Sequence, residues 1–306
     1  MRKLFLFTIL AFNIFNAISQ QDPMFTHYMF NTVAINPAYA GSRDALTITG
    51  LHRSQWVSFD GAPTTQTITA HTPIFNQNVG LGISFLNDKI GPSNTSSLYI
   101  DFSYKIKINE RAKLAFGLKS GFNIRRTDIS SLNILEGNDP VFSESLEKDF
   151  MPNFGFGLYY FTDKYYIGAS IPKLLENTFN TGTETDVAIE KKHYFLIGGA
   201  VFKLSEIFML RPATFIKITE AAPIEADISA LLYVKEKFWV GAMYRTGDAL
   251  GALAGINITD YLTVGYSFDW SMTNTTFKYN AGSHEIIIRY DLVLAGNKKI
   301  RSPRYF

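Results

Sequence analysis

The chain has 306 residues, of which 29 are lysine or arginine and 27 are acidic, and it contains no cysteine. A net charge of only +2 argues against a nucleic-acid-binding protein, which needs a strongly basic surface. The absence of cysteine excludes disulfides, zinc–thiolate sites, iron–sulfur clusters and thiol nucleophiles. Charged residues make up 18% of the chain and aromatic residues 15%, whereas soluble domains carry about 25% charged residues. Since the mean hydropathy is only +0.02, the apolar residues must be interleaved with polar ones.

Residues 1–19 have the three parts of a signal peptide. The basic pair Arg2-Lys3 precedes an apolar run from Leu4 to Phe15, and Ala17-Ile18-Ser19 offers the small residues that signal peptidase requires. A membrane anchor is the weaker alternative, because a spanning helix needs about 20 apolar residues and this run is shorter. We therefore predict export and cleavage before Gln20. A chain with no further apolar run of that length can span a membrane only as a closed β-barrel.

Residues 20–44 precede the first predicted strand and carry several large apolar side chains. The dipeptide Asn36-Pro37 and Gly41 favour a turn rather than a strand in this stretch. Because the stretch is too apolar to remain in solvent, we predict that it packs in the lumen of a barrel or at its periplasmic mouth, as a plug or as a docking patch. The alternative is that it only braces the barrel wall. The residues expected to make these contacts are Phe25, Tyr28, Met29, Phe30, Asn36, Pro37 and Tyr39.

From residue 45 onward, apolar and polar residues alternate with a period of two, which is typical of half-buried β-strands. Segment 193–204 departs from this pattern because it is apolar on both faces. The pattern predicts about 14 strands, at 45–53, 64–72, 79–87, 98–108, 114–125, 154–161, 165–171, 193–204, 208–218, 227–235, 238–245, 250–258, 262–270 and 284–292. We therefore expect an all-β fold, a transmembrane antiparallel up-and-down β-barrel over residues 45–293, with 294–306 as a periplasmic tail.

The connections between these strands alternate in length along the chain. Tight polar turns are predicted near residues 109–111, 162–164, 205–206, 236–237 and 259–260. Longer loops fall at about 126–152, 172–192, 219–226 and 271–283, whereas the short join at 245–250 breaks the alternation. Short periplasmic turns and longer extracellular loops are the signature of outer-membrane barrels. A soluble β-sandwich has no reason to sort its loops in this way.

Ionic residues fall on the strand face opposite the large apolar residues. A lysine or arginine on the lipid face near the bilayer midplane costs about 2–4 kcal/mol, so the ionic face must line the lumen. The lumen charges predicted on this ground are Asp101, Lys105, Lys119, Arg211, Asp227, Arg245, Asp269 and Arg289. Aromatic residues at strand ends, such as Tyr165, Trp239 and Tyr261, suit the aromatic girdles at the membrane interfaces. For each of these aromatic residues taken singly, ordinary β-propensity is the favoured explanation.

No motif of an enzyme or a cofactor site occurs in the chain. Patterns of the G-x-S-x-G, H-E-x-x-H, P-loop and EF-hand types are absent, and the five histidines lack the spacing of metal ligands. The acidic residues between 128 and 147 could form a Ca²⁺ site, but a solvated loop explains them more simply. We therefore predict a non-enzymatic protein with no catalytic residues, no cofactor and no metal. We expect no small-molecule substrate and no nucleic acid as partners.

The start of the predicted mature chain carries a distinctive pair of motifs. Gln21-Asp22-Pro23-Met24-Phe25-Thr26-His27-Tyr28-Met29-Phe30-Asn31 is followed by Ile35-Asn36-Pro37-Ala38-Tyr39-Ala40-Gly41-Ser42. This block resembles the start of the PorP/SprF family of outer-membrane proteins. Weaker similarities to that family continue at His52-Arg53-Ser54-Gln55-Trp56, Gly61-Ala62-Pro63, Gln66-Thr67, 152–160, 167–172, 244–249, 265–269, 282–285 and 302–306.

The resemblance implies a role in type IX secretion and gliding motility. Members of the family are thought to serve the secretion machinery, or to accompany a secreted adhesin or other cargo and to help its export or cell-surface attachment. The partners implied are therefore the bilayer of the bacterial outer membrane, the type IX machinery and an adhesin-type cargo. Two alternatives stay open at this point, a general diffusion porin for small solutes and an outer-membrane enzyme such as a lipase.

Overall fold

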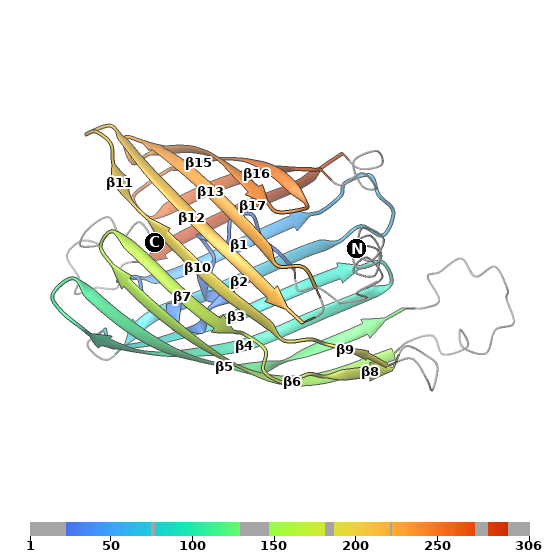
Figure 1. Cartoon of the computed structure of the whole chain (residues 1–306). Coiled ribbons are helices and arrows are strands. Elements are labelled where there is room, and N and C mark those ends of the chain that lie inside the picture. Colours follow the sequence, from blue (N-terminus) through green and yellow to red (C-terminus); the bar gives the residue numbers. More distant parts are fainter. Residues whose placement is uncertain are drawn as a thin grey trace, which may run out of the picture.

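The computed structural model describes residues 23–74, 77–128, 147–180, 187–220, 222–272 and 281–292. The predicted signal peptide, the predicted tail at 294–306 and most of the acidic 128–147 loop lie outside these residues. The described chain forms an antiparallel barrel in which each strand pairs with the next along the sequence (Figure 1). The barrel strands are β1 (Leu46–Ser54), β2 (Thr64–Ile74), β3 (Val79–Ile90), β4 (Ser93–Lys107), β5 (Ala112–Thr127), β6 (Glu147–Thr162), β7 (Tyr165–Ile171), β10 (His193–Ala200), β12 (Phe208–Thr219), β13 (Glu225–Val234), β14 (Phe238–Arg245), β15 (Ala249–Asn257), β16 (Leu262–Ser271) and β17 (Ser283–Leu292).

Two pairings close the barrel. The first strand, β1, runs antiparallel to the last, β17, from Leu46↔Leu292 to Ser54↔His284. On the other side β10 pairs with β12, and the two-residue strand β11 (Phe202–Lys203) continues the course of β10 along β12. The fold predicted from the alternation, a closed antiparallel barrel of 14 strands, is therefore confirmed.

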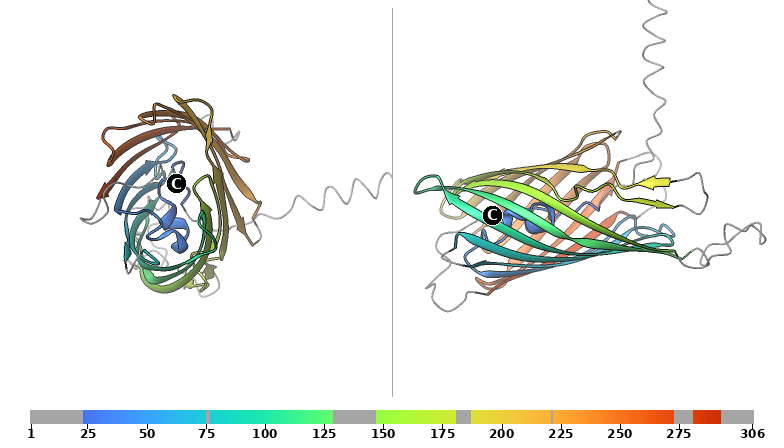
Figure 2. Two further views of the ribbon diagram at one scale, coloured as in Figure 1. Left: turned by 90° about the vertical axis from the view of Figure 1, so that its left-hand side faces the viewer. Right: turned by 90° about the horizontal axis from the view of Figure 1, so that it is seen from below.

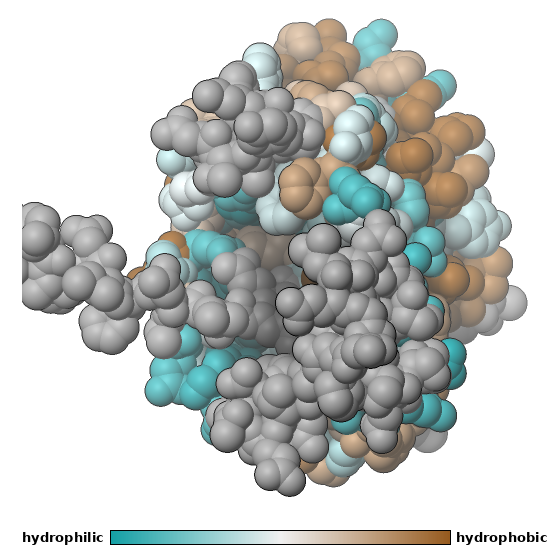
Figure 3. Space-filling model, turned by 90° about the vertical axis from the view of Figure 1, so that its right-hand side faces the viewer, coloured by the Kyte–Doolittle hydropathy of each residue, from teal (hydrophilic) through white to brown (hydrophobic). Residues whose placement is uncertain are grey.

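The five tight turns predicted from the sequence all lie at one end of the barrel, whereas the short joins at 91–92 and 246–248 lie at the other. Each of these five turns joins a strand that runs toward the first of these ends to the next strand, and β1 begins and β17 ends there as well. We call this the short-turn end, which lies on the left in Figure 1, and the opposite one the long-loop end. In outer-membrane barrels the short turns face the periplasm. Seen from the long-loop end, hydrophilic side chains gather around the described rim and hydrophobic ones along the outer wall (Figure 3).

Two connections differ from the sequence prediction. The alternation stops at residue 87 and resumes at 98, yet β3 and β4 extend to a two-residue turn at Gly91 and Pro92. The extension pairs polar residues on both strands, for example Asn87 with Ser96, so a pattern of apolar alternation cannot detect it. Within the predicted 172–192 loop, the short strands β8 (Thr178–Asn180) and β9 (Val187–Ile189) form a separate hairpin.

The outer wall is apolar and the inner wall is ionic. Large apolar side chains point outward and are exposed, among them Ile68 (59%), Ile100 (61%) and Leu118 (58%). The residues that alternate with them are buried and include Asp101 and Lys119. Because apolar side chains on this scale would be costly in water, the outer wall suits the hydrocarbon of a bilayer.

Two short helical turns precede the barrel, α2 (Thr32–Ile35) and η1 (Pro37–Tyr39). Within the described ranges, no helix is long and apolar enough to cross a membrane.

Candidate functional site: the occupied lumen

Residues 23–44, which we call the lumen segment, lie inside the barrel. Viewed end-on, the ring of strands surrounds this segment (Figure 2, left). The residues that the sequence singled out here are all buried, namely Phe25, Tyr28, Met29, Phe30, Asn36, Pro37 and Tyr39. The segment runs from contacts with strand ends at the long-loop end, around Thr26, to contacts at the short-turn end, around Arg43.

The first anchor of the lumen segment is a buried cluster near the long-loop end. Glu285 accepts hydrogen bonds from the backbone N–H groups of Thr26 (2.9 Å) and His27 (2.7 Å). The Thr26 hydroxyl donates to Asp269 at 2.6 Å, and Arg53 donates to the same Asp269 oxygen at 2.7 Å. Charge-assisted hydrogen bonds of this kind are about twice as strong as neutral ones, so the cluster holds the segment firmly to β1, β16 and β17.

These residues come from four of the motifs that carry the family resemblance. Arg53 belongs to the motif at 52–56, Asp269 ends the 265–269 motif, Glu285 ends the 282–285 motif and Thr26 lies in the first block. The barrel brings them together because β1, β16 and β17 are neighbours in the sheet. Residues from four separate motifs thus meet in one buried cluster.

An aromatic stack forms the second contact. The ring of Phe30 stacks on Trp239 with centroids 5.1 Å apart, and the guanidinium groups of Arg289 and Arg211 lie over the Phe30 ring at 5.4 and 6.0 Å. Trp239 is 1% exposed and faces the lumen, so it does not belong to an interfacial girdle. The alternation along β14 places it inward, and a strand-end position alone does not show which face a residue occupies.

Polar side chains in the middle of the lumen bind the segment directly. The Asn31 side chain donates to the Thr67 hydroxyl at 2.9 Å and accepts from the Thr69 hydroxyl at 2.8 Å. The Tyr28 hydroxyl lies 3.1 Å from the Ser229 hydroxyl on the opposite wall. The segment is therefore bonded to both sides of the barrel.

Glycines on the inner wall make room for the turn at Asn36–Ala40. A Cβ atom at Gly117 would lie 2.0 Å from the Ala38 nitrogen, and one at Gly157 would lie 2.1 Å from the Asn36 side chain. A Cβ atom at Gly80 would meet the Ala40 carbonyl oxygen at 2.1 Å. No real Cβ contact is that short. At Gly117 and Gly80 the contacting atoms belong to the backbone of the segment, so the close approach of backbone to wall requires glycine at these two positions.

The third anchor lies at the short-turn end. Arg43 donates two hydrogen bonds to Asp291, at 2.8 and 3.1 Å, and the Thr47 hydroxyl donates to Asp291 at 2.7 Å. Burial lowers the pKa of Arg43, but the Asp291 carboxylate more than offsets this effect and holds that pKa above its ordinary value. The Lys105 ammonium donates to the Gly41 carbonyl, and the Ser103 hydroxyl donates to the Ala40 carbonyl at 2.6 Å.

The structure places all eight predicted lumen charges on the inner wall. Seven are buried and Arg289 is half-buried. Three of the acids form ion pairs across the wall: Asp101 with Lys119 (3.0 Å), Asp227 with Arg245 (2.8 Å) and Asp269 with Arg53 (2.7 Å). Arg211 donates to the Tyr233 hydroxyl at 2.7 Å, Arg289 lies 3.6 Å from Asp291, and Lys105 binds the lumen segment.

The sequence prediction missed several lumen residues that hold the segment. Glu285 and Asp291 lie an even number of positions from Arg289, so the alternation already places them on its face. Arg53 likewise alternates with outward residues in β1. The alternation therefore already indicated that these three residues face the lumen. It was overlooked because apolar and polar residues alternate less regularly in the first and last strands than in the central ones.

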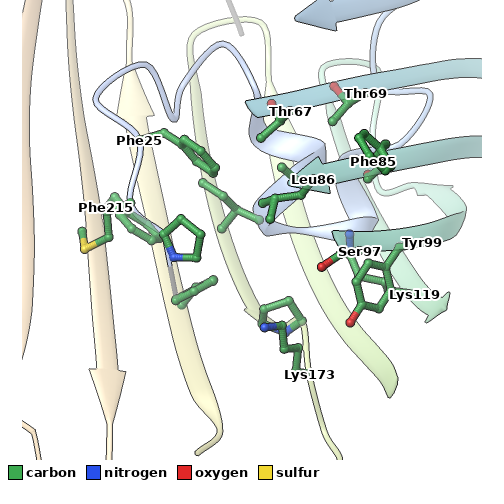
Figure 4. A pocket seen from close by; sticks show the side chains of 17 residues that line it. Phe25, Thr67, Thr69, Phe85, Leu86, Ser97, Tyr99, Lys119, Lys173 and Phe215 are labelled. Atoms are coloured by element: carbon green, nitrogen blue, oxygen red, sulfur yellow. The ribbon is translucent and has the colours of Figure 1, made fainter. Parts of the chain in front are cut away.

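A small cavity lies above the segment, toward the long-loop end. It holds about 90 Å³, enough for a few water molecules, and its wall includes Phe25, Phe195, Phe215 and Leu86 (Figure 4). Lys119 and Lys173 border it, and each is paired, with Asp101 and Glu190 respectively. Within the part of the chain that the structure covers, no cluster of His, Asp or Glu could hold a metal ion.

A closed barrel with an apolar outer wall and an ionic, occupied lumen defines the protein as an integral outer-membrane β-barrel. The sequence matches the family described as type IX secretion system membrane protein PorP/SprF over residues 17–290, and the chain belongs to this family. It is thus an outer-membrane component of type IX secretion. No curated protein sequence matches the chain significantly.

Solved structures resemble the barrel at low sequence identity. The CymD monoaromatic hydrocarbon channel has a TM-score of 0.50 at 10% identity, over 85% of this chain and 91% of that one. Omp33 of Acinetobacter baumannii has 0.47 at 10% identity, over 82% of this chain and 99% of that one. A Pseudomonas aeruginosa FadL homologue has 0.44 at 11% identity, over 81% and 89%. At such identities the likeness concerns the fold alone.

Proposed function

We propose that the protein is a plugged platform rather than a pore. It binds components of the type IX machinery or a secreted adhesin-type cargo, and helps the export or cell-surface attachment of that cargo, including in gliding motility. In this proposal residues 1–19 are a cleaved signal peptide, 20–44 are the plug, 45–293 are the barrel and 294–306 are a periplasmic tail. The barrel itself catalyses no reaction.

The observation that carries the proposal is that the barrel wall holds the lumen segment at both of its ends and in its middle. Hydrogen bonds to the buried carboxylates of Glu285 and Asp269 hold its start, and the ion pair of Arg43 with Asp291 holds its end. Three glycines of the inner wall, which we call the glycine cradle, leave room for its middle; they are Gly80, Gly117 and Gly157. Release of the segment would break the ion pair of Arg43 with Asp291, and loss of one partner of a buried ion pair costs about 3–5 kcal/mol. It would also leave Glu285 without the hydrogen bonds from Thr26 and His27. A diffusion porin gains nothing from a segment held in this way, whereas a platform requires only that the barrel stay closed.

Conductance in planar bilayers tests the plug. The full-length protein is expected to conduct little, and a variant lacking residues 20–44 is expected to open channels. A steady porin-like conductance of the unaltered protein would contradict the platform and support the diffusion porin.

Capture of partners tests the platform. A photo-crosslinking amino acid replaces the exposed Phe59 at the long-loop end or Lys164 at the short-turn end, and the crosslinked proteins are identified by mass spectrometry. We expect a secretion component or a cargo to be captured. A control crosslinker at Ile100, on the lipid-facing wall, should capture neither. Equal capture at all three positions, or none at any, would overturn the proposal.

A further inference from the structure

The outer wall changes from apolar to polar at the long-loop end of β3 to β6, which are neighbours in the sheet (Figure 1). Phe85, Leu98 and Phe122 are level with one another on the outer faces of β3, β4 and β5. Two positions closer to the long-loop end, the outer face carries Asn87 and Ser96, and the Ser96 hydroxyl donates to the Asn87 side chain at 2.9 Å. The apolar wall therefore ends here.

A row of cationic side chains lies two positions further toward the same end. Lys89 of β3 is level with Asn94 of β4. Asn94 is in turn level with Arg126 of β5, and Arg126 with Lys148 of β6. The alternation puts all four on the outer face, and the three cations are exposed. We call Lys89, Arg126 and Lys148 the cationic row, which spans about 14 Å because neighbouring strands are about 4.8 Å apart.

The cationic row lies at the depth of lipid headgroups. Phe150 shares the outer face with Lys148, is 63% exposed and packs on Phe122 with ring centroids 5.1 Å apart. Two residues rise about 7 Å along a strand, and less along the bilayer normal because barrel strands tilt by about 35–45°. The headgroup layer adds about 5–7 Å on each side of the hydrocarbon. With Phe150 at the edge of the hydrocarbon, Lys148 lies beside the headgroups.

The cationic row occupies one side of the barrel. On the outer faces of the other barrel strands, no described position at the long-loop end carries lysine or arginine. Asp88 and Asp149 adjoin the row in sequence but alternate onto the lumen face, and the exposed Asp128 lies beyond the end of β5. An anionic amphiphile that approached this side would meet cations and an apolar wall together.

We propose that the cationic row binds the phosphate groups of an outer-leaflet glycolipid of the lipid A type, whose acyl chains lie against the apolar wall of β3 to β6. Arg126 suits bidentate contact with phosphate, and Lys89 and Lys148 supply point charges on either side of it. A soluble anion would gain nothing from the apolar wall, whereas a lipid uses both features. The inference concerns the membrane around the barrel and is independent of the proposed platform function.

Binding of diphosphoryl lipid A to the full-length protein in detergent micelles, followed by native mass spectrometry, tests the inference. We expect saturable binding by the unaltered protein. The variant K89Q/R126Q/K148Q should bind at least about tenfold more weakly, because three contacts with anionic headgroups are lost together. Equal binding by this variant would overturn the inference.

The matched control is K203Q/K235Q/K237Q. It removes the same three charges from exposed positions at the short-turn end. This variant should bind lipid A as well as the unaltered protein does, and gel mobility before and after boiling checks that both variants are folded barrels. An equal loss of binding in the control would show that lipid A responds only to net charge, and would overturn the inference.

Two further ligands separate a lipid site from other sites. Lipid A from which the phosphates have been removed should bind at least about tenfold more weakly to the unaltered protein. Inorganic phosphate in large molar excess should not displace lipid A. Equal binding of the phosphate-free lipid would assign the contact to the apolar wall alone, and displacement by inorganic phosphate would assign it to a free anion, so either result would overturn the inference.

Amine labelling provides a test that needs no variant. With lipid A in the micelles, Lys89 and Lys148 of the unaltered protein should react at least about threefold more slowly with a water-soluble N-hydroxysuccinimide ester, because the phosphates cover their ammonium groups. The exposed Lys203 and Lys235 should react at an unchanged rate. No protection of Lys89 and Lys148, or equal protection of all four lysines, would overturn the inference.

Discussion

Glu285 of β17 and His27 of the lumen segment share two hydrogen bonds, one from the His27 backbone N–H and one from its Nδ1, both at 2.7 Å. Both side chains are fully buried. Since a carboxylate only accepts, Nδ1 must carry the hydrogen in this contact. One side chain thus fixes both the backbone and the ring orientation of the segment, which makes Glu285 the residue whose loss should loosen it most.

We expect Glu285→Ala to lower the free energy of unfolding by about 3–5 kcal/mol, because it leaves buried polar groups without their acceptor. Guanidinium unfolding followed by circular dichroism measures this loss, and limited proteolysis should cut near residue 26 sooner. Glu206→Ala is the control, since Glu206 is 89% exposed and pairs with the exposed Lys203. Equal stability of the two variants would show that the cluster does not hold the segment.

The same substitution of glycine by alanine should affect stability differently inside the glycine cradle and outside it. Gly117→Ala places a Cβ atom against the backbone of the lumen segment, so we expect a loss of about 1–3 kcal/mol and more frequent channel openings. Gly50→Ala meets no atom within 4 Å and removes a flexible residue from β1, so it should be neutral or stabilising by up to about 1 kcal/mol. If both variants behave alike in unfolding and conductance, the wall does not need glycine at Gly117.

The barrel itself could be predicted from the sequence because the alternation of apolar and polar residues within each strand shows which face meets lipid and which meets the lumen. In β16 the alternation of Val264, Tyr266 and Phe268 with Thr263 and Ser267 reflects a lipid face and a lumen face, and needs no knowledge of other strands. The ends of strands were less predictable where both faces meet water or headgroups. The paired polar residues of β3 and β4 near Gly91 are the clearest example.

The arrangement inside the lumen could be predicted only in part. The apolar content of residues 20–44 and the turn signals at Asn36-Pro37 indicated packing within the barrel or at its mouth. No local pattern could show that Phe30 meets Trp239, because these residues are 209 positions apart and their contact depends on strand order around the barrel. The sequence also could not show why glycines occupy positions 80, 117 and 157, because the reason is the lumen segment that contacts the wall at these positions.

On the lipid-facing wall, the loss of stability caused by a lysine should depend on how deep the lysine lies in the bilayer. Ile100 lies in the middle of β4 and is 61% exposed, so Ile100→Lys should destabilise the barrel by about 2–4 kcal/mol. Ile108 lies just beyond the end of β4 and is 55% exposed, so Ile108→Lys should cost no more than about 1 kcal/mol. Unfolding in lipid vesicles measures both values. A similar cost at both positions would contradict the placement of β4 across the bilayer.

The three tryptophans offer a test of which faces point inward. Trp270 is 57% exposed on the outer wall, whereas Trp239 is 1% exposed inside the lumen. In vesicles of brominated lipids, a variant that keeps only Trp270, with Phe at the other two positions, should lose much of its fluorescence, because bromine quenches on contact. A variant that keeps only Trp239 should be quenched little, because Phe30 and the barrel wall separate its ring from the acyl chains. Equal quenching would mean that β14 presents the opposite face to the membrane, and the contact between Trp239 and the lumen segment would then be lost as well.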